Sequence, residues 1–438
     1  MEPTENGTGQ RPITETTVPG ARPTAQGAAR GFASRAVHAG ERPERPDFTP
    51  TSTPIYPATA FVYDDTATLD AVFGNERPGY VYTRYGNPTT RALEEAIADL
   101  EGTEDAVAFA SGMGAVHAAI LLDARAGDRV VAARDCYGAT YAVLTSIFAS
   151  LGIETTFADL LDLPTLERTL ADLKPTLVCA ETISNPLLRV ADIRAVAGLA
   201  HRHGAKLMID NTFASPYLVN PSRHGADSVV HSTTKYLGGH GDVTGGAVAT
   251  TVARADGLRD VLKLTGAVLG PFESWLTLRG IKTLPLRLRE QSASAARIAD
   301  WLGEHPGVRR VFYPGRDDLG PAAAQFNGAE RGGMVSFEIA GGRPEVFRFL
   351  EALRLCLPAT TLGDVHSLIL YPVISSHRAL TPAQRAEVGI GEGLVRLSVG
   401  IEEVADIIAD LEQAITAALP ARMTEREATG QPATVGAG

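Results

Sequence analysis

Short strand-like runs alternate with helical stretches from about residue 80 onward. The runs are rich in β-branched and small apolar residues and occupy 106–110, 128–133, 176–181, 206–210, 227–232 and 245–251. Helix-type periodicity fills the intervals, as in LPTLERTLADL and IRAVAGLAHRHG. This alternation is typical of βαβ units, whose helices cover the faces of a mainly parallel sheet. It predicts a large α/β domain over residues 81–285.

A second, smaller α/β domain is predicted for residues 286–419. A helical stretch at about 282–303 leads into it, and strand-like runs follow at 332–340 and 394–401. The chain has 438 residues, a length at which two domains are expected.

The remaining segments have a different composition. Residues 1–30 and 420–438 are rich in Gly, Pro, Thr and other polar residues, which predicts disordered tails. Residues 31–80 are interrupted by prolines and predict an extended N-terminal arm laid across another surface.

Charge and cysteine content exclude several classes of protein. The 40 Lys and Arg residues and 51 Asp and Glu residues give a net charge of −11, which argues against binding to nucleic acid or an anionic membrane. No segment approaches the roughly 18 apolar residues of a membrane-spanning helix. Cys136, Cys179 and Cys356 have neither disulfide-type nor metal-type spacing. We therefore expect a cytoplasmic protein without a metal site.

Lys235 stands in the most informative segment, DSVVHSTTKYLGGHGDVTGG, between a predicted strand and a glycine-rich turn. Ligands of open α/β sheets bind at the carboxyl ends of strands, so Lys235 lies where a cofactor would bind. The hydroxyls of Ser232 and Thr234 could bind a phosphate there while the amine forms an imine. On this segment alone, a solvated lysine after a polar turn fits equally well.

Two other segments place polar groups at strand ends. Asp210 ends the apolar strand KLMID and needs a partner, either a protonated pyridine nitrogen or the N–H groups of a turn. The run AVAFASGMGAVHAAILL passes from strand to helix through residues 111–114, where backbone N–H groups can face an anion. No GxGxxG follows this strand, which disfavours a nucleotide-binding oxidoreductase.

These segments together resemble the transsulfuration, or Cys/Met metabolism, family of PLP-dependent enzymes, and in particular its cystathionine and methionine γ-lyases. The resemblance covers roughly residues 33–418 and implies an aspartate-aminotransferase-like fold, known as fold type I. The matching motifs are STPIYPATAF (52–61), YTRYGNPT (82–89), SGMGA (111–115), CYGAT (136–140), SNP (184–186), DNTFASP (210–216), HSTTKYLGGHGD (231–242), RGIKTLPLR (279–287), LGDVHSL (362–368) and RLSVGIE (396–402).

The resemblance implies that Lys235 holds pyridoxal 5'-phosphate (PLP) as a Schiff base and that Asp210 pairs with the ring nitrogen. Tyr137 would stack on the ring, and Asn185 would contact the ring hydroxyl. The phosphate would be bound by the backbone N–H groups or hydroxyls of Gly112, Met113, Ser232 and Thr234.

The resemblance also implies an assembly with shared active sites. Tyr82 and Arg84 match the pair that reaches the phosphate from a neighbouring subunit, a task that suits the planar donors of arginine. The expected assembly is a homotetramer built from two dimers. His231 and His240 flank the lysine loop and are interpreted as groups that orient the backbone.

The predicted substrate contacts are Arg396, which would anchor the α-carboxylate, with Ser367 and His366 beside it. Two positions depart from the family pattern. Ala139 stands where methionine γ-lyases have a cysteine, and His366 stands where cystathionine enzymes usually have a glutamate. GHGD (239–242) and TGAVLGP (265–271) nevertheless look most like the methionine branch.

The activity expected from the resemblance is γ-elimination from a sulfur-containing L-amino acid such as cystathionine or methionine. The products would be a 2-oxo acid, ammonia and a thiol, with Lys235 and Tyr137 as catalytic groups. The alternative is γ-replacement on an O-acyl-homoserine, as in cystathionine γ-synthases and sulfhydrylases. An inactive PLP-fold scaffold is disfavoured because a scaffold would have no use for Lys235, Asp210, Tyr137 and Arg396 together.

Overall fold

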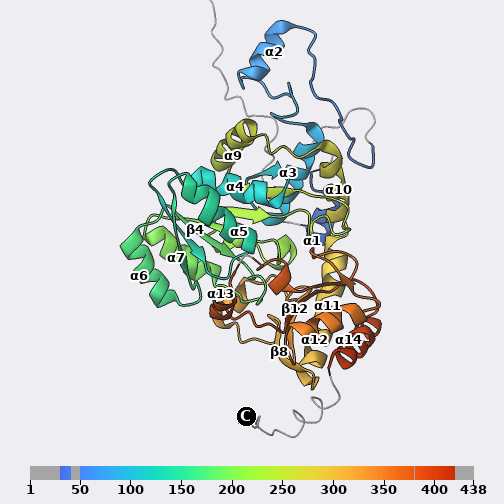
Figure 1. Cartoon of the computed structure of the whole chain (residues 1–438). Helices are drawn as coiled ribbons and strands as arrows, with labels where there is room; N and C mark the ends of the chain where they lie inside the picture. Colours follow the sequence, from blue (N-terminus) through green and yellow to red (C-terminus); the bar gives the residue numbers. More distant parts are fainter. Residues whose placement is uncertain (1–29, 41–49, 379, 420–438) are drawn as a thin grey trace, which may run out of the picture.

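The computed structural model describes residues 30–40, 50–378 and 380–419. The predicted tails lie outside these residues, apart from residue 30. Two β-sheets with helices packed against them form the body of the molecule (Figure 1). The larger sheet is mostly parallel and the second is smaller, which confirms the predicted α/β architecture.

The larger sheet has seven strands in the order β1-β7-β6-β5-β4-β2-β3. Strand β7 runs antiparallel to both of its neighbours, β1 and β6, and the other neighbouring strands pair in parallel. Six of the strands match predicted runs. Strand β3 was not predicted, because it is an edge strand with only its last residue buried and therefore lacks an apolar run. The strands are β1 (Asp105–Phe109), β2 (Arg129–Ala133), β3 (Glu154–Ala158), β4 (Leu177–Glu181), β5 (Lys206–Asp210), β6 (Ser228–His231) and β7 (Gly246–Thr250).

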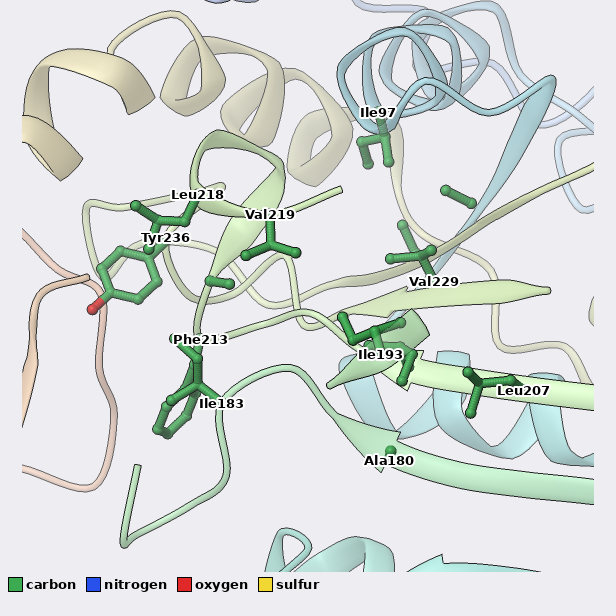
Figure 2. Close-up of a cluster of buried hydrophobic side chains, with 14 of the residues drawn as sticks. Ile97, Ala180, Ile183, Ile193, Leu207, Phe213, Leu218, Val219, Val229 and Tyr236 are labelled. Atoms are coloured by element: carbon green, nitrogen blue, oxygen red, sulfur yellow. The ribbon is translucent and has the colours of Figure 1, made fainter. Parts of the chain in front are cut away.

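Hydrophobic side chains cover both faces of this sheet. Leu207 and Ile209 pack with α3 and α7 in one cluster, part of which Figure 2 shows, whereas Met208 packs with α4 and α9 in another. This alternation along β5 buries the strand from both sides. The helices of this part are α3 (Pro88–Glu101), α4 (Gly112–Asp123), α5 (Gly138–Val143), α6 (Leu163–Leu173), α7 (Ile193–Arg202), α8 (Ser215–Leu218), α9 (Val252–Thr265) and α10 (Pro271–Ile281).

Helix α3 has clear sequence signals at both ends. The side chain of Asn87 accepts a hydrogen bond from the backbone N–H of Thr89, and Pro88 occupies the first turn. Gly102 follows the helix with a φ of 73°, a left-handed conformation that glycine adopts without strain. These signals make Glu101 the last helical residue.

The second sheet has five strands in the order β10-β11-β12-β9-β8. Helix α11 (Leu284–Glu304), close to the predicted stretch, connects the two sheets. The strands are β8 (Val308–Phe312), β9 (Met334–Ile339), β10 (Leu357–Pro358), β11 (Leu368–Leu370) and β12 (Leu394–Ser398), and the helices are α12 (Arg343–Ala352), α13 (Pro382–Glu387) and α14 (Val404–Ala418).

The N-terminal segment differs in part from the extended arm that the sequence predicts. It contains α1 (Phe32–His38) and α2 (Thr66–Phe73), and residues 41–49 lie outside the described part of the chain. Asp65 caps α2 by accepting the N–H of Thr68 at 2.7 Å. This cap is a local helix signal, but the prolines of the segment favoured the prediction of an extended chain. Helix α2 stands apart from the body of the molecule (Figure 1). Within the described ranges, no helix is both long and apolar enough to span a membrane.

Candidate active site

Lys235 lies four residues after the end of β6, in a series of turns. Its amine donates a hydrogen bond to Oγ1 of Thr361 at 2.7 Å, and it forms no ion pair with an acidic residue among those described. Burial lowers the pKa of Lys235 to about 8, and the charge of Arg396 acts in the same direction. A sizeable fraction of the amine is therefore neutral near neutral pH, which is the form that attacks an aldehyde.

Asp210 ends β5, the strand beside β6. Its Oδ1 accepts the backbone N–H of Thr212 at 2.9 Å, and no lysine or arginine of the described ranges forms an ion pair with it. Burial raises the pKa of Asp210, while the hydrogen bonds from Thr212 and the charge of His231 lower it. A cationic ring nitrogen would supply the direct charge partner that this carboxylate lacks.

Gly112 and Met113 form the first turn of α4, whose leading N–H groups have no carbonyl partner within the helix. The side chain of Ser111 accepts the N–H of Gly114, so the two N–H groups before it remain free to face an anion. A Cβ on Gly112 would lie 2.7 Å from the Cβ of Ser232. Only glycine therefore allows this turn to approach the turn before Lys235 so closely.

Ser232 and Thr234 lie on that second turn. The backbone N–H of Ser232 donates to Oγ1 of Thr212 at 2.8 Å. The Thr234 hydroxyl accepts the N–H of Gly245 at 3.0 Å and lies 3.2 Å from the carbonyl oxygen of the same residue. Both residues thus stand at the edge of the anion site, and their contact with phosphate remains a prediction.

Tyr137 and Asn185 are held by one carboxylate that the sequence analysis missed. Oε1 of Glu181 accepts the backbone N–H of Tyr137 at 2.5 Å, and Oε2 accepts that of Asn185 at 3.1 Å. Glu181 ends β4 and is paired in register with Asp210. Burial and the charge of Asp210 raise the pKa of Glu181 well above its usual range. Its position at the end of a buried strand, like that of Asp210, is the signal that would have revealed it.

Arg396 reaches the site from β12 in the second sheet. Its Nη1 donates to Oδ1 of Asn185 at 2.8 Å, and the guanidinium carbon lies 5.7 Å from the ring centroid of Phe213. Its Nε has no hydrogen-bond partner among the described residues, although the side chain is buried. Burial lowers the pKa of Arg396 to about 10. A buried guanidinium with no acidic partner suits the carboxylate of a ligand.

Ser367 and His366 precede β11. The Ser367 hydroxyl donates to Oε2 of Glu402 at 2.8 Å and accepts the N–H of Gly400 at 2.9 Å. The His366 side chain is 61% exposed, and its Nδ1 lies 3.1 Å from Oδ1 of Asp364. The structure thus places Ser367 inside a hydrogen-bond network and His366 at the surface. Their contacts with a substrate remain predictions.

Tyr82 and Arg84 have contacts outside the rest of the predicted site. Nη1 of Arg84 donates to the carbonyl oxygen of Lys263 at 2.7 Å, and the guanidinium lies 4.8 Å from the ring centroid of Tyr85. Within the described part of the chain, neither Tyr82 nor Arg84 is hydrogen-bonded to the other predicted site residues. Their proposed role in a neighbouring subunit's site is therefore untested.

Comparison with known proteins agrees with this geometry. Residues 33–416 match the family described as Cys/Met metabolism PLP-dependent enzyme. The chain belongs to this family. PLP is therefore its cofactor, and the predicted family and fold type are confirmed.

Members of the Cys/Met metabolism family with different reactions resemble this chain to a similar degree. An L-methionine gamma-lyase of Porphyromonas gingivalis is 41% identical over 398 residues, 88% of this chain and 97% of that protein. A cystathionine gamma-lyase of Bacillus subtilis is 42% identical, over 83% of this chain and 94% of that protein. The crystal structure of a cystathionine gamma synthase from Xanthomonas oryzae pv. oryzae in complex with cystathionine has a TM-score of 0.83 and 39% identity, covering 89% of this chain and 98% of that one.

The residues present fit PLP. The aldehyde of PLP requires an amine that can lose its proton, and the protonated ring nitrogen requires an acidic side chain as its charge partner. The phosphate requires several hydrogen-bond donors close together. Lys235, Asp210 and the first turn of α4 supply these groups from neighbouring strand ends and turns. The close approach of Gly112 to Ser232 brings the anion site next to the lysine loop.

Proposed function

We propose that the protein is a PLP-dependent γ-lyase that cleaves a carbon–sulfur bond in a sulfur-containing L-amino acid such as methionine or cystathionine. With methionine and water, the products would be 2-oxobutanoate, ammonia and methanethiol. The observation that carries the proposal is the Lys235 amine, whose pKa is lowered by burial and by the charge of Arg396. The buried Asp210 carboxylate lies at the end of the neighbouring strand.

Each residue has a distinct task in this proposal. PLP, when bound, supplies an electron-accepting ring that stabilises negative charge at the substrate α-carbon. Lys235 holds the cofactor and later accepts the α-proton at its Nζ. Arg396 binds the substrate carboxylate, and its bond to Asn185 fixes the guanidinium in place. Asp210 keeps the ring nitrogen protonated.

Tyr137 is proposed to donate a proton to the departing sulfur. Tyr137 is 39% exposed, and Oε1 of Glu181 accepts its backbone N–H. A hydroxyl that moves a proton in the transition state typically contributes about 100-fold or more to the rate.

The test is an assay of the purified, PLP-loaded protein with L-methionine, L-cystathionine and L-homocysteine. We expect at least one substrate to yield a 2-oxo acid and, in equal amounts, a thiol or, from homocysteine, hydrogen sulfide, and Lys235→Ala to abolish both. Loaded protein that releases no 2-oxo acid from any of the three would contradict the proposal.

γ-Replacement is a second candidate because the cystathionine gamma synthase is about as similar to this chain as the two lyases are. In that reaction a thiol would displace the acyl group of an O-acyl-homoserine. The same protein supplied with an O-acyl-homoserine and L-cysteine would then form a thioether. Thioether formation without 2-oxobutanoate would favour this second function.

The proposed assembly is a homotetramer of two dimers in the cytoplasm. Its support is that, among the described residues, Arg84 is hydrogen-bonded to the carbonyl oxygen of Lys263 and to none of the other predicted site residues. The described cysteines are free and buried, which agrees with a reducing compartment. A measurement of the molecular mass in solution tests the assembly. A comparison of PLP affinity between the parent protein and Arg84→Ala tests the shared site. A monomer with tight PLP binding would contradict both.

A further inference from the structure

Two buried side chains, Glu101 and His231, form a pair at the ends of α3 and β6. Glu101 is the last residue of α3, and His231 is the last residue of β6. Nε2 of His231 lies 2.6 Å from Oε1 of Glu101, and their side chains are 1% and 0% exposed. The sequence analysis interpreted His231 as a group that orients the backbone, whereas the structure pairs it with a carboxylate.

The buried Glu101 carboxyl group needs hydrogen-bond partners. A buried carboxylate is costly, and more so at the C-terminal end of a helix, where the helix dipole is negative. The other side-chain groups that contact it are neutral amides, Nδ2 of Asn211 at 2.9 Å and Nδ2 of Asn220 at 3.5 Å. Among the described residues, His231 is the only group in an ion pair with Glu101. The short contact with Nε2 of His231 is therefore the main side-chain interaction that compensates the burial of Glu101.

This pair is connected to the strand ends that carry the site. Asn211 follows Asp210 directly, and His231 precedes Ser232 directly. Oδ1 of Asn211 also accepts the hydroxyl of Thr182, which follows the end of β4. The Glu101 carboxylate thus links the ends of three adjacent strands. The charge of His231 also lowers the pKa of Asp210, against the effect of burial.

We propose that Glu101 and His231 are positioning residues that act through Asp210. The His231 ring, held in place by Glu101, stabilises the Asp210 carboxylate and keeps it correctly placed for the ring nitrogen of PLP. This inference rests on the proposed role of Asp210.

The test is a double-mutant cycle on PLP affinity, with E101Q, D210N and the double variant. We expect E101Q to weaken PLP binding about tenfold when Asp210 is present, because the His231 ring is no longer held in place. In the D210N background E101Q should change the affinity by less than about twofold, because no carboxylate remains to be kept ionised. For every variant we record the visible absorption spectrum of the PLP-loaded protein and the thermal stability of the cofactor-free protein.

Asp123 provides a matched control. It is also the last residue of a helix, α4, its side chain is only 7% exposed, and it forms an ion pair of 2.6 Å with Arg254. Because α4 begins at the anion site and has 12 residues, its last residue lies about 17 Å away. D123N should lower thermal stability and leave PLP affinity and the spectrum unchanged.

Two results would overturn the inference: an E101Q protein that is less stable but binds PLP as the parent does, or the same loss of affinity in both backgrounds. If E101Q fails to fold, H231Q takes its place in the cycle with the same expectations. A parent protein that acquires no PLP absorption band would instead contradict the cofactor assignment.

Discussion

The reactivity of Lys235 gives the most direct prediction from the electrostatics of the site. Its pKa falls from 10.5 to about 8, first by burial and second by the charge of Arg396. The difference corresponds to roughly 3 kcal/mol against the charged amine. At pH 8 about half of the amine would be neutral, compared with about 0.3% for an ordinary lysine.

The perturbation is Arg396→Gln in the cofactor-free protein. The initial rate of PLP attachment, trapped with borohydride, is measured from neutral to strongly alkaline pH. In the parent the rate should rise with pH and reach half of its maximum near pH 8, because the neutral amine is the nucleophile. Arg396→Gln removes only the second cause, so its midpoint should be higher than the parent's and still below 10.5.

Thr361→Val is the matched control, because it removes the hydroxyl bonded to the amine and leaves the charge of Arg396. Its midpoint should stay close to the parent's. A parent midpoint near that of ordinary lysines would refute the reasoning, and so would a midpoint that Arg396→Gln does not move.

Three further substitutions test other parts of the account. Asp210→Asn should reduce turnover at least about 100-fold in steady-state assays, because the charge that pairs with the ring nitrogen is lost; near-normal turnover would contradict its role. Tyr137→Phe should lower kcat about 100-fold or more while PLP affinity, followed by fluorescence titration, stays within about twofold, and an unchanged kcat would exclude proton transfer by the hydroxyl. Asp410→Asn should cost about 2–4 kcal/mol in denaturant unfolding, because the carboxylate accepts the N–H groups of Arg354, Leu355 and Cys356. Since the pKa of Asp410 is lowered from 3.8, this stabilisation should be present above that pH and be lost as the pH falls through the lower folded value.

The sequence predicts what depends on local periodicity. Strand-type runs locate Asp210 at the end of its strand and Lys235 in the turn after the next strand, and both assignments agree with the structure. The caps of α3 can be read from Asn87 and Gly102 in the same way. These signals are local because each depends on neighbours within a few residues.

Contacts between distant parts of the chain could not be predicted. Glu101 and His231 are 130 positions apart, and Lys235 and Thr361 are 126 apart. Nothing in either local sequence identifies its partner, because a pairing of this kind arises only when helices and strands pack. The resemblance supplied roles for residues within its motifs, which is why Glu101 was missed.

The central claim is that the Lys235 amine carries the cofactor. The most direct measurement is borohydride reduction of the PLP-loaded protein, followed by proteolysis and mass spectrometry of the peptides. The account predicts one stoichiometric phosphopyridoxyl group, attached at Lys235. A modification at another lysine, or none at all, would contradict it.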